Sequence, residues 1–549
     1  MAADKVAKDS DLFEYKIHDK SILGDDWCCI YATGSKVPFK KEHFEMAMLN
    51  VIREPNINST AVLRADILKE TLYDLGVEES KVIKHTENEV EVIDPESKAI
   101  GVYDMEVRNP KLNDELELKI LRGIVRRMVP RNPYKDFSIN QTCLLMNSPQ
   151  KFPETSLVIY TPHIKEEDEC PFYIPHVESV GILLHEGILS VHYIPYSDVS
   201  SLNDESERVV RTAWRLLQTA YKHSKGVMQG YEKRVNHDQV VDKVKFQDRY
   251  IILKGKYSKF LIENWVESTD PKKHVFEDVA IAAFLIELWI KIYGENFRDK
   301  MQFRDLGCGN GVLCYILIEE GVKGIGIDAR HRKSWSIYPN KIQNCLKEQV
   351  IIPSVLIRPH PNVKKAMPFL ETNGSVFPVK VVSNDLIAPA TVLYSGEDLL
   401  KSPQVNVVEF EKDTFIIGNH SDELTCWIPL LGYPFMVIPC CSHNLSGDRI
   451  RYNVRKAQPH HQDSSKMVNS TYAGLVDRVE YIAERVGWEV EKEMLRIPST
   501  RNAAIIGYKN DKLPEFPTQE VYDILFEDGG PLNWVQNAMN LVKRNPRNH

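Results

Sequence analysis

The sequence predicts an α/β protein in which a Rossmann-like, doubly wound domain follows a mixed α+β N-terminal region. The first observation is the glycine-rich turn at Gly307, Gly309 and Gly311, which follows a strand pattern and precedes a helix pattern. The second is Asp328, which ends another strand pattern about twenty residues later. The third is the alternation of strand and helix patterns over residues 245–510.

The spacing of the glycines indicates which cofactor the turn would hold. It is G-x-G-x-G, whereas dinucleotide sites use G-x-G-x-x-G with a pyrophosphate at the helix N-terminus. This spacing favours S-adenosylmethionine, which has no pyrophosphate, and so predicts a class I S-adenosylmethionine-dependent methyltransferase domain. Asp305 is expected to hold the amino group of the cofactor, Asp328 its ribose hydroxyls, and Asp385 is expected to border its adenine. The predicted cofactor-binding residues are Asp305, Gly307, Gly309, Gly311, Asp328, Asp385 and Asn419.

The composition limits the classes of protein to which the chain can belong. With 549 residues, of which 43% are hydrophobic and 27% charged, it has the profile of a soluble globular protein with two or more domains. The net charge of −8 excludes binding to nucleic acid through overall charge, so any RNA contact must come from local basic patches. Ten scattered cysteines, no N-terminal signal pattern and no apolar run of about 18 residues predict a cytoplasmic protein with no membrane contact.

The first half of the chain is divided by pattern into two regions. Residues 1–110 form an N-terminal region of unknown role, and residues 111–244 form a mixed α/β region. Helices are predicted over 41–50, 65–75 and 204–223, and strands over 90–94, 157–160, 180–184 and 189–194.

The second half holds the predicted methyltransferase domain, residues 245–510, and a C-terminal tail, residues 511–549. The segment 277–293 is apolar almost all round, which predicts a helix buried against the sheet. After the strand that precedes the glycine turn, strands two to five are predicted at 323–328, 379–382, 413–418 and 434–439, with a closing antiparallel pair at 488–495 and 503–508. Helices are predicted at 312–320 and, in the tail, at 534–542.

A polar loop follows the fourth predicted strand. Residues 418–429 read Gly-Asn-His-Ser-Asp-Glu-Leu-Thr-Cys-Trp-Ile-Pro, which places a histidine, two carboxylates and an amide between two apolar strands. With Pro-Cys-Cys-Ser-His at 439–443 and Leu-Arg-Ile-Pro-Ser-Thr-Arg at 495–501, this loop resembles the tRNA (uracil-2′-O)-methyltransferase family that modifies uridine 44 of tRNA. The resemblance covers residues 120–510, and a long insertion at 338–406 departs from it.

The resemblance implies methyl transfer from S-adenosylmethionine to the 2′-hydroxyl of a tRNA uridine, with serine tRNA as the substrate. Residues 111–244 are a possible tRNA-binding region. This hydroxyl is a poor nucleophile with a high pKa, so the site must align it and accept its proton. His420 and Asp422 are the predicted catalytic residues for these tasks, and a lysine is expected from Lys256 or Lys273. A helper protein is left open.

Several alternatives stay open on the sequence. A methyltransferase acting on a base or on protein would keep the fold, but the Asn- or Asp-Pro-Pro-aromatic run common in those enzymes is missing after the fourth strand. A catalytically silent RNA-binding protein is disfavoured by the intact glycine turn, and a dehydrogenase by the glycine spacing. Asp422 could also act as a helix cap. No metal site is expected, because Cys440, Cys441, His443 and His420 lack paired C-x-x-C spacing.

Two basic runs are candidates for contacts with RNA phosphates. The first, which is interleaved with aromatic residues, consists of Arg122, Arg126, Arg127, Arg131 and Lys135. The second directly follows Asp328 and consists of Arg330, His331, Arg332 and Lys333.

Overall fold

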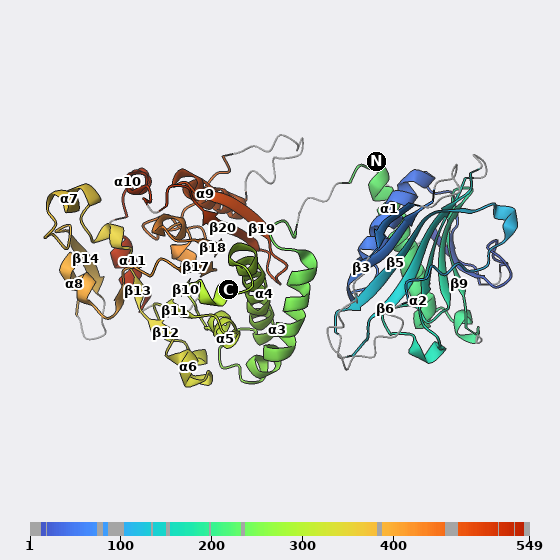
Figure 1. Cartoon of the computed structure of the whole chain (residues 1–549), viewed down its shortest axis with the longest axis horizontal. Helices are drawn as coiled ribbons and strands as arrows, with labels where there is room; N and C mark the ends of the chain where they lie inside the picture. Colours follow the sequence, from blue (N-terminus) through green and yellow to red (C-terminus); the bar gives the residue numbers. More distant parts are fainter. Residues whose placement is uncertain are drawn as a thin grey trace. The chain divides into compact units, whose positions relative to one another are not determined.

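The computed structural model divides into two compact units, Met1–Lys233 and Arg234–His549 (Figure 1). The structure describes residues 12–17, 19–73, 81–85, 104–132, 135–149, 154–196, 199–231, 237–381, 387–455, 470–513, 515–531 and 533–542. Within these residues, no helix is both long enough and apolar enough to cross a bilayer.

The first unit is built on one antiparallel sheet, whose described strands run in the order β1-β2-β9-β8-β7-β6-β5-β3-β4. The strands are β1 (Phe13–Tyr15), β2 (Cys28–Thr33), β3 (Val62–Leu72), β4 (Lys81–His85), β5 (Lys119–Pro130), β6 (Ile139–Asn147), β7 (Thr155–Pro162), β8 (Ser179–His185) and β9 (Ile188–Ile194). Helices α1 (Lys41–Arg53) and α2 (Arg208–Met228) share a hydrophobic core with this sheet (Figure 1). Val210, Ala213 and Leu217 repeat at helical spacing on the buried side of α2.

Most of the elements predicted for the first half are confirmed. Strands β7, β8 and β9 and helices α1 and α2 occur where the patterns place them. The helix predicted at 65–75 is wrong: this segment is part of β3, because β5 offers it a long antiparallel partner that outweighs local helix propensity. The strand predicted at 90–94 lies outside the described residues.

A domain boundary at residue 110 is not found. Strand β3 lies before this position and β5 after it, and the two strands pair in one sheet. The first unit instead continues to Lys233, close to the boundary predicted near residue 244.

The second unit contains one main sheet, a helical layer on each side of this sheet and two small accessory sheets. Its strands are β10 (Gln302–Leu306), β11 (Gly324–Asp328), β12 (Leu346–Glu348), β13 (Val350–Ile351), β14 (Val376–Val381), β15 (Ala390–Ser395), β16 (Val405–Asn406), β17 (Thr414–Asn419), β18 (Phe435–Ile438), β19 (Glu489–Met494) and β20 (Ala503–Lys509). Its helices are α3 (Lys243–Glu263), α4 (Pro271–Tyr293), α5 (Val312–Glu319), α6 (Asn340–Gln343), α7 (Pro361–Ala366), α8 (Gly396–Lys401), α9 (Thr471–Arg485), α10 (Thr518–Glu527) and α11 (Trp534–Leu541).

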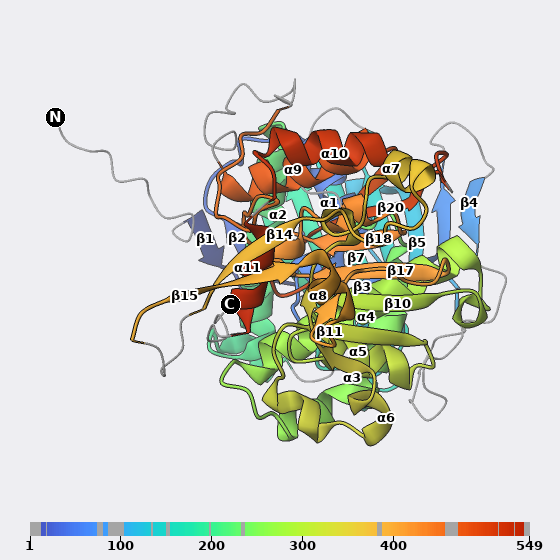
Figure 2. The same cartoon turned by 90° about the vertical axis from the view of Figure 1, so that its left-hand side faces the viewer.

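The main sheet of the second unit has the strand order β12-β11-β10-β17-β18-β20-β19, and its described strands up to β18 run parallel. Side chains of β17 alternate between two cores: Phe415 and Ile417 pack with α3, α4 and α5, whereas Ile416 packs with α9, α10 and α11. Figure 2 shows α9 and α10 on one side of β10 and β17, with α3 and α5 on the other. The antiparallel pair β19–β20 closes the sheet as predicted.

Two predictions for this unit need correction. The third strand, predicted at 379–382, is not in the main sheet: β14 forms a separate hairpin with β15 inside the long insertion. The short strand β12 takes the place beside β11. The tail is part of the domain, because Trp534 and Ala538 of α11 are buried in the same core as α9.

Candidate active site

A cavity of about 620 Å³ lies in the second unit, where the parallel strands end. The C-terminal ends of β10, β11 and β17 meet at one edge of the sheet, and the loops that follow them line the cavity. The start of α4, the end of β18, the loop before β20 and helix α11 complete its walls. Doubly wound sheets bind their ligands at this edge.

Hydrogen bonds fix the glycine turn between β10 and α5. The backbone N–H of Gly309 donates to Asp328 Oδ2 over 3.0 Å, so the end of β11 holds the middle of the turn. The Trp335 indole N–H donates to the Gly309 carbonyl over 2.9 Å, and the Tyr338 hydroxyl donates to the Asn310 carbonyl over 2.9 Å. The chain itself therefore orders this turn before any ligand binds.

Two glycines of the turn serve different purposes. Gly309 lines the cavity with φ +52°, and a Cβ added there would meet no atom within 4 Å, so the missing side chain leaves room for a ligand. Gly311 does not line the cavity; it is the left-handed N-cap of α5, and a Cβ there would lie 3.1 Å from Leu346. Its predicted contact with the cofactor is thus replaced by a structural role at the start of the helix.

Asp305 presents an unsatisfied carboxylate oxygen in this cavity. The residue is 1% exposed, and its Oδ2 accepts a hydrogen bond from the Cys314 thiol over 3.4 Å. Its Oδ1 has no hydrogen-bond partner among the described residues. Burial, with a further contribution from the charge of Asp328, raises the pKa of Asp305 to about 7. An ammonium group placed here would satisfy the oxygen, which fits the amino group of S-adenosylmethionine.

The loop after β17 is tied to helix α4 by two side-chain contacts. The Asn419 amide donates to Asp278 Oδ1 over 2.9 Å, and His420 Nε2 lies 3.0 Å from Glu277 Oε1. Asp270 caps the N-terminus of helix α4, and the helix presents Glu277 and Asp278 to the cavity. Burial, together with the charge of Glu277, raises the pKa of Asp278 well above its usual range.

This loop also has an unusual backbone. His420 and Asp422 have φ values of +51° and +44°, in the left-handed region that non-glycine residues rarely adopt. Such residues cost about 1–3 kcal/mol each and cluster at functional sites. Close packing holds the loop down, because a Cβ at Gly418 would lie 2.1 Å from Ile428. The strained segment is therefore supported by its surroundings.

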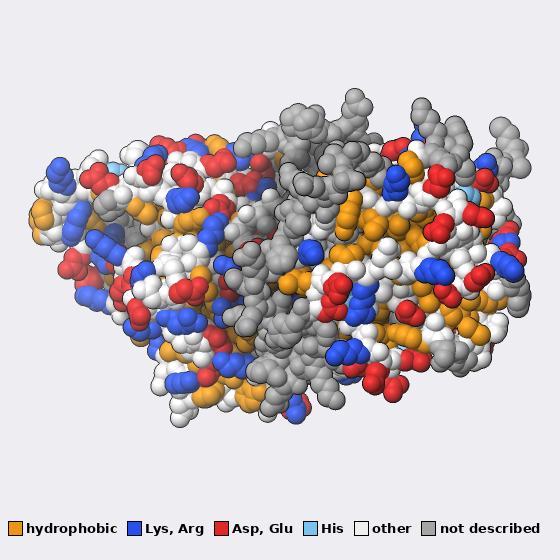
Figure 3. Space-filling view, turned by 45° about the vertical axis from the view of Figure 1, so that its right-hand side comes forward, with side chains coloured by type: hydrophobic (Ala, Val, Ile, Leu, Met, Phe, Trp, Pro, Cys, Tyr) orange, Lys and Arg blue, Asp and Glu red, His pale blue; other side chains and the backbone are white. Residues whose placement is uncertain are grey.

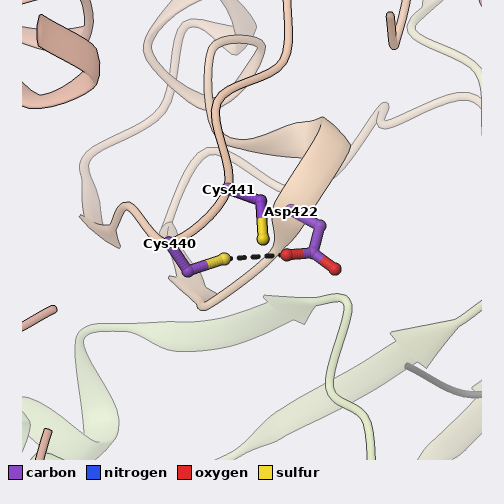
Figure 4. Close-up of side chains that lie close together, drawn as sticks. All are labelled: Asp422, Cys440 and Cys441. Carbon is purple, nitrogen blue, oxygen red and sulfur yellow. Dashed lines mark hydrogen bonds between the residues drawn. The ribbon is translucent and has the colours of Figure 1, made fainter. Parts of the chain in front are cut away.

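Asp422 meets two cysteines that follow β18 (Figure 4). The Cys440 thiol donates to Asp422 Oδ1 over 2.8 Å. A carboxylate oxygen of Asp422 and the sulfur atoms of Cys440 and Cys441, all of which are possible metal ligands, lie within 4.8 Å of one another. The hydrogen bond with Cys441, burial and the charge of Asp422 all raise the pKa of Cys440, which keeps its thiol protonated. His420 and His443 are outside this three-residue group.

The structure brings most of the predicted site residues to one cavity. Those that line it are Asp305, Gly307, Gly309, Asp328, Asn419, His420 and Asp422. Asp385 lies outside the described residues. Of the two expected lysines, Lys273 lines the cavity, whereas Lys256 pairs with Glu320 and is absent from the lining.

Sequence reasoning missed residues that reach the cavity from distant segments. Glu277 and Asp278 are adjacent acids that directly precede the long apolar run of α4, and that contrast was the available signal. Trp534, on α11, was assigned to the tail, and only its amphipathic pattern hinted at a packed helix.

The two predicted basic runs have different surroundings. In the first, Arg126 is 4% exposed and donates to Gln141 Oε1 over 2.7 Å, while Arg122 pairs with Glu70 over 2.6 Å. In the second, Arg330 and Arg332 line the cavity. On the face of the first unit shown in Figure 3, positive and negative side chains are interspersed among hydrophobic ones. Arg122 and Arg126 of the first run therefore have structural partners within the first unit.

Comparisons with known proteins agree with this site. A family described as "TRM44-like, N-terminal bet v1-like domain" matches residues 7–234, and one described as "Predicted AdoMet-dependent methyltransferase" matches residues 240–353. The tRNA (uracil-O(2)-)-methyltransferase of Saccharomyces cerevisiae is 65% identical over 98% of this chain and 97% of the relative. The chain belongs to this family. The resemblance predicted from the loop after β17 is thus confirmed.

Other members of the family show the same full-length match. The tRNA (uracil-O(2)-)-methyltransferase of Kluyveromyces lactis is 64% identical over 98% of this chain and 100% of the relative. That of Schizosaccharomyces pombe is 35% identical over 96% of this chain and 94% of the relative. No solved structure matches the chain. The family supports S-adenosylmethionine as the methyl donor.

Proposed function

We propose that this chain is a tRNA 2′-O-methyltransferase with a Rossmann-like class I catalytic domain. The observation that carries the proposal is a single cavity that joins the glycine turn and Asp328 to the polar loop of His420 and Asp422. S-adenosylmethionine supplies an electrophilic methyl group on a sulfonium. The 2′-oxygen of a uridine would take this methyl group, the sulfur of the cofactor would keep the electron pair of the broken carbon–sulfur bond, and residues of this chain would accept the hydroxyl proton.

The cofactor is assigned to the wall formed by β10 and β11. Asp305 Oδ1 would accept from its amino group, since that oxygen is buried and without a partner among the described residues. Asp328, at the end of β11, would accept from the ribose hydroxyls. Gly309 leaves the backbone open to the methionine part. These contacts position the cofactor. The proton of the 2′-hydroxyl is accepted by residues of the opposite wall of the cavity.

His420 is assigned as the acceptor of the 2′-hydroxyl proton. Glu277 lies 3.0 Å from His420 Nε2, and this carboxylate orients the ring and stabilises the cation that forms when the other nitrogen takes a proton. Because the hydroxyl has a single proton, it donates its hydrogen bond to Asp422 before transfer and turns it to His420 as the new bond forms. The Cys440 thiol, which donates to Asp422 Oδ1, fixes the direction of that carboxylate. Asn419 positions the loop through Asp278 rather than contacting the cofactor directly.

The finer parts of the proposal come from the family resemblance. They are uridine 44 as the modified nucleotide and serine tRNA as the substrate. A cytoplasmic location is supported by the ten cysteines, all of which are free.

The test is methylation of unmodified serine tRNA transcript with radiolabelled S-adenosylmethionine, followed by digestion to nucleosides. The matched control transcript carries 2′-deoxyuridine at position 44, which removes only the acceptor oxygen. Label in 2′-O-methyluridine that disappears with the control supports the proposal. Label in a base-methylated nucleoside, or label that persists in the control, overturns the assigned acceptor.

A further inference from the structure

A second cavity adjoins the first. It has a volume of about 390 Å³ and shares Cys440 and Arg501 with the larger cavity. Its lining consists of Cys440, Cys441, Ser442, Arg449, Ile450, Arg451, Thr471, Tyr472, Leu475 and Arg501. Among the residues that the structure describes, the lining contains three arginines and no carboxylate, in a chain whose net charge is −8.

The first cavity is lined by more carboxyl groups than cations. Its lining includes the carboxyl groups of Glu277, Asp278, Asp305, Asp328, Asp422 and Glu423 beside the cations of Lys273, Arg330, Arg332 and Arg501. Repulsion among the carboxylates contributes to the raised pKa values of Asp278 and Asp305. A tRNA ribose that reaches Asp422 carries a phosphodiester, and a cationic partner close to Asp422 would offset the repulsion between the phosphate and the carboxylate.

Two of the arginines are available for such a role. Neither Arg449 nor Arg501 forms an ion pair with a carboxylate within the part of the chain that the structure describes. Arg501 Nη1 donates to Cys441 Sγ over 3.6 Å, and sulfur is a weak acceptor. By contrast, Arg455 pairs with Asp477 over 2.9 Å.

The loop that carries Arg449 is held by its own backbone. The Ile450 N–H donates to the Ser442 carbonyl over 3.2 Å, and His443 bridges Arg449 in antiparallel fashion. On the other side, the Tyr472 hydroxyl accepts from the Ala503 N–H over 2.9 Å, which fixes the wall beside Arg501. These contacts fix the backbone from which Arg449 and Arg501 extend.

We propose that Arg449 and Arg501 bind the phosphodiester on the 3′ side of the methylated uridine. The inference rests on the proposed function. The 3′-phosphate and the 2′-hydroxyl sit on neighbouring ribose carbons, so a group that binds the phosphate must lie next to the group that holds the hydroxyl. Cys440 provides that link, because it lines both cavities and donates to Asp422 over 2.8 Å. Guanidinium groups suit phosphate oxygens in charge and geometry.

The first test compares the double variant Arg449→Gln/Arg501→Gln with Arg358→Gln. Arg358 is an exposed, carboxylate-paired arginine of the same unit outside both cavities, so it controls for loss of charge. The double variant should raise KM for tRNA about 10-fold and lower the salt slope of binding by about one, because one phosphate loses its cationic partner, with an unchanged Kd for S-adenosylmethionine. Arg358→Gln should change none of these. A normal KM and salt slope in the double variant overturns the inference.

The second test neutralises the phosphate instead of the arginines. The tRNA carries 2′-deoxyuridine at the target position, which prevents reaction, with or without a methylphosphonate linkage on its 3′ side. The neutral linkage should weaken binding to the wild-type chain and have no further effect on the double variant. Equal losses in both proteins overturn the assignment.

The two proposals fail separately. If the wild-type chain forms no 2′-O-methyluridine, the proposed function fails. If it forms 2′-O-methyluridine while the double variant loses affinity for S-adenosylmethionine and keeps its KM for tRNA, the arginines bind the cofactor, and the phosphate site is overturned.

Discussion

The two walls of the larger cavity are built in different ways. The cofactor wall is local in sequence: Gly309 and Asp328 belong to consecutive strand–turn segments and are joined by one hydrogen bond of 3.0 Å. The acceptor wall is assembled from α4, the loop after β17, the end of β18 and the loop before β20. Cofactor binding therefore depends on a preformed turn, whereas proton transfer depends on contacts between distant segments.

The largest expected effect is on the acceptor wall. His420→Gln should lower kcat about 1000-fold, because it removes the proposed proton acceptor while keeping a polar side chain. The Kd for S-adenosylmethionine should change less than about twofold, since the cofactor is assigned to the other wall. Single-turnover rates and cofactor titration measure the two quantities. If turnover and cofactor affinity fall by the same factor, cofactor binding and proton transfer do not depend on separate walls.

Asp422→Asn is the companion change on this wall. It should lower kcat about 100-fold, because the amide can still contact a hydroxyl but carries no charge. If His420→Gln retains normal turnover while Asp422→Asn loses it, the proton passes to Asp422, and the two roles are exchanged.

The next effect is on the cofactor wall. Gly309→Asp should weaken S-adenosylmethionine binding at least about 100-fold, because the new side chain enters the open space at φ +52° and adds charge beside Asp328. Gly374→Asp is the matched control: Gly374 has φ +72° with nothing within 4 Å and lies outside the cavity lining. Cofactor titration of both variants separates ligand exclusion from backbone strain. Similar weakening in both would indicate strain alone.

The contrast between the walls also explains what the sequence could predict. The glycine turn and Asp328 were found because the chain order sets their geometry. The pairing of His420 with Glu277 joins residues far apart in sequence, so no local pattern contains it. The misassigned third strand has the same cause: β12 occupies the place beside β11 by tertiary pairing, and it is too short to give a clear pattern.

A smaller effect concerns pH and again separates the walls. Burial raises the pKa of Asp305 to about 7, so the carboxylate becomes protonated as the pH falls below 7. The cofactor's ammonium group binds the ionised form, and its Kd should rise about 10-fold per pH unit below 7. Titration calorimetry between pH 5 and 8 measures this, with Asp305→Asn as the variant that should bind weakly at every pH. A wild-type Kd that does not vary with pH would remove Asp305 from the contact.

The smallest effect is expected outside both walls, in the basic strand β5. Arg122→Gln removes a cation from the denser basic run of the sequence, but Arg122 pairs with Glu70 over 2.6 Å. The variant should lower the free energy of unfolding by about 1 kcal/mol or less, since Glu70 also keeps Arg53 at 3.0 Å. The salt slope of tRNA binding should stay unchanged, in contrast to the arginines beside Asp422. A slope reduced by about one would show that β5 contacts phosphate, so that tRNA binding is shared between the two units.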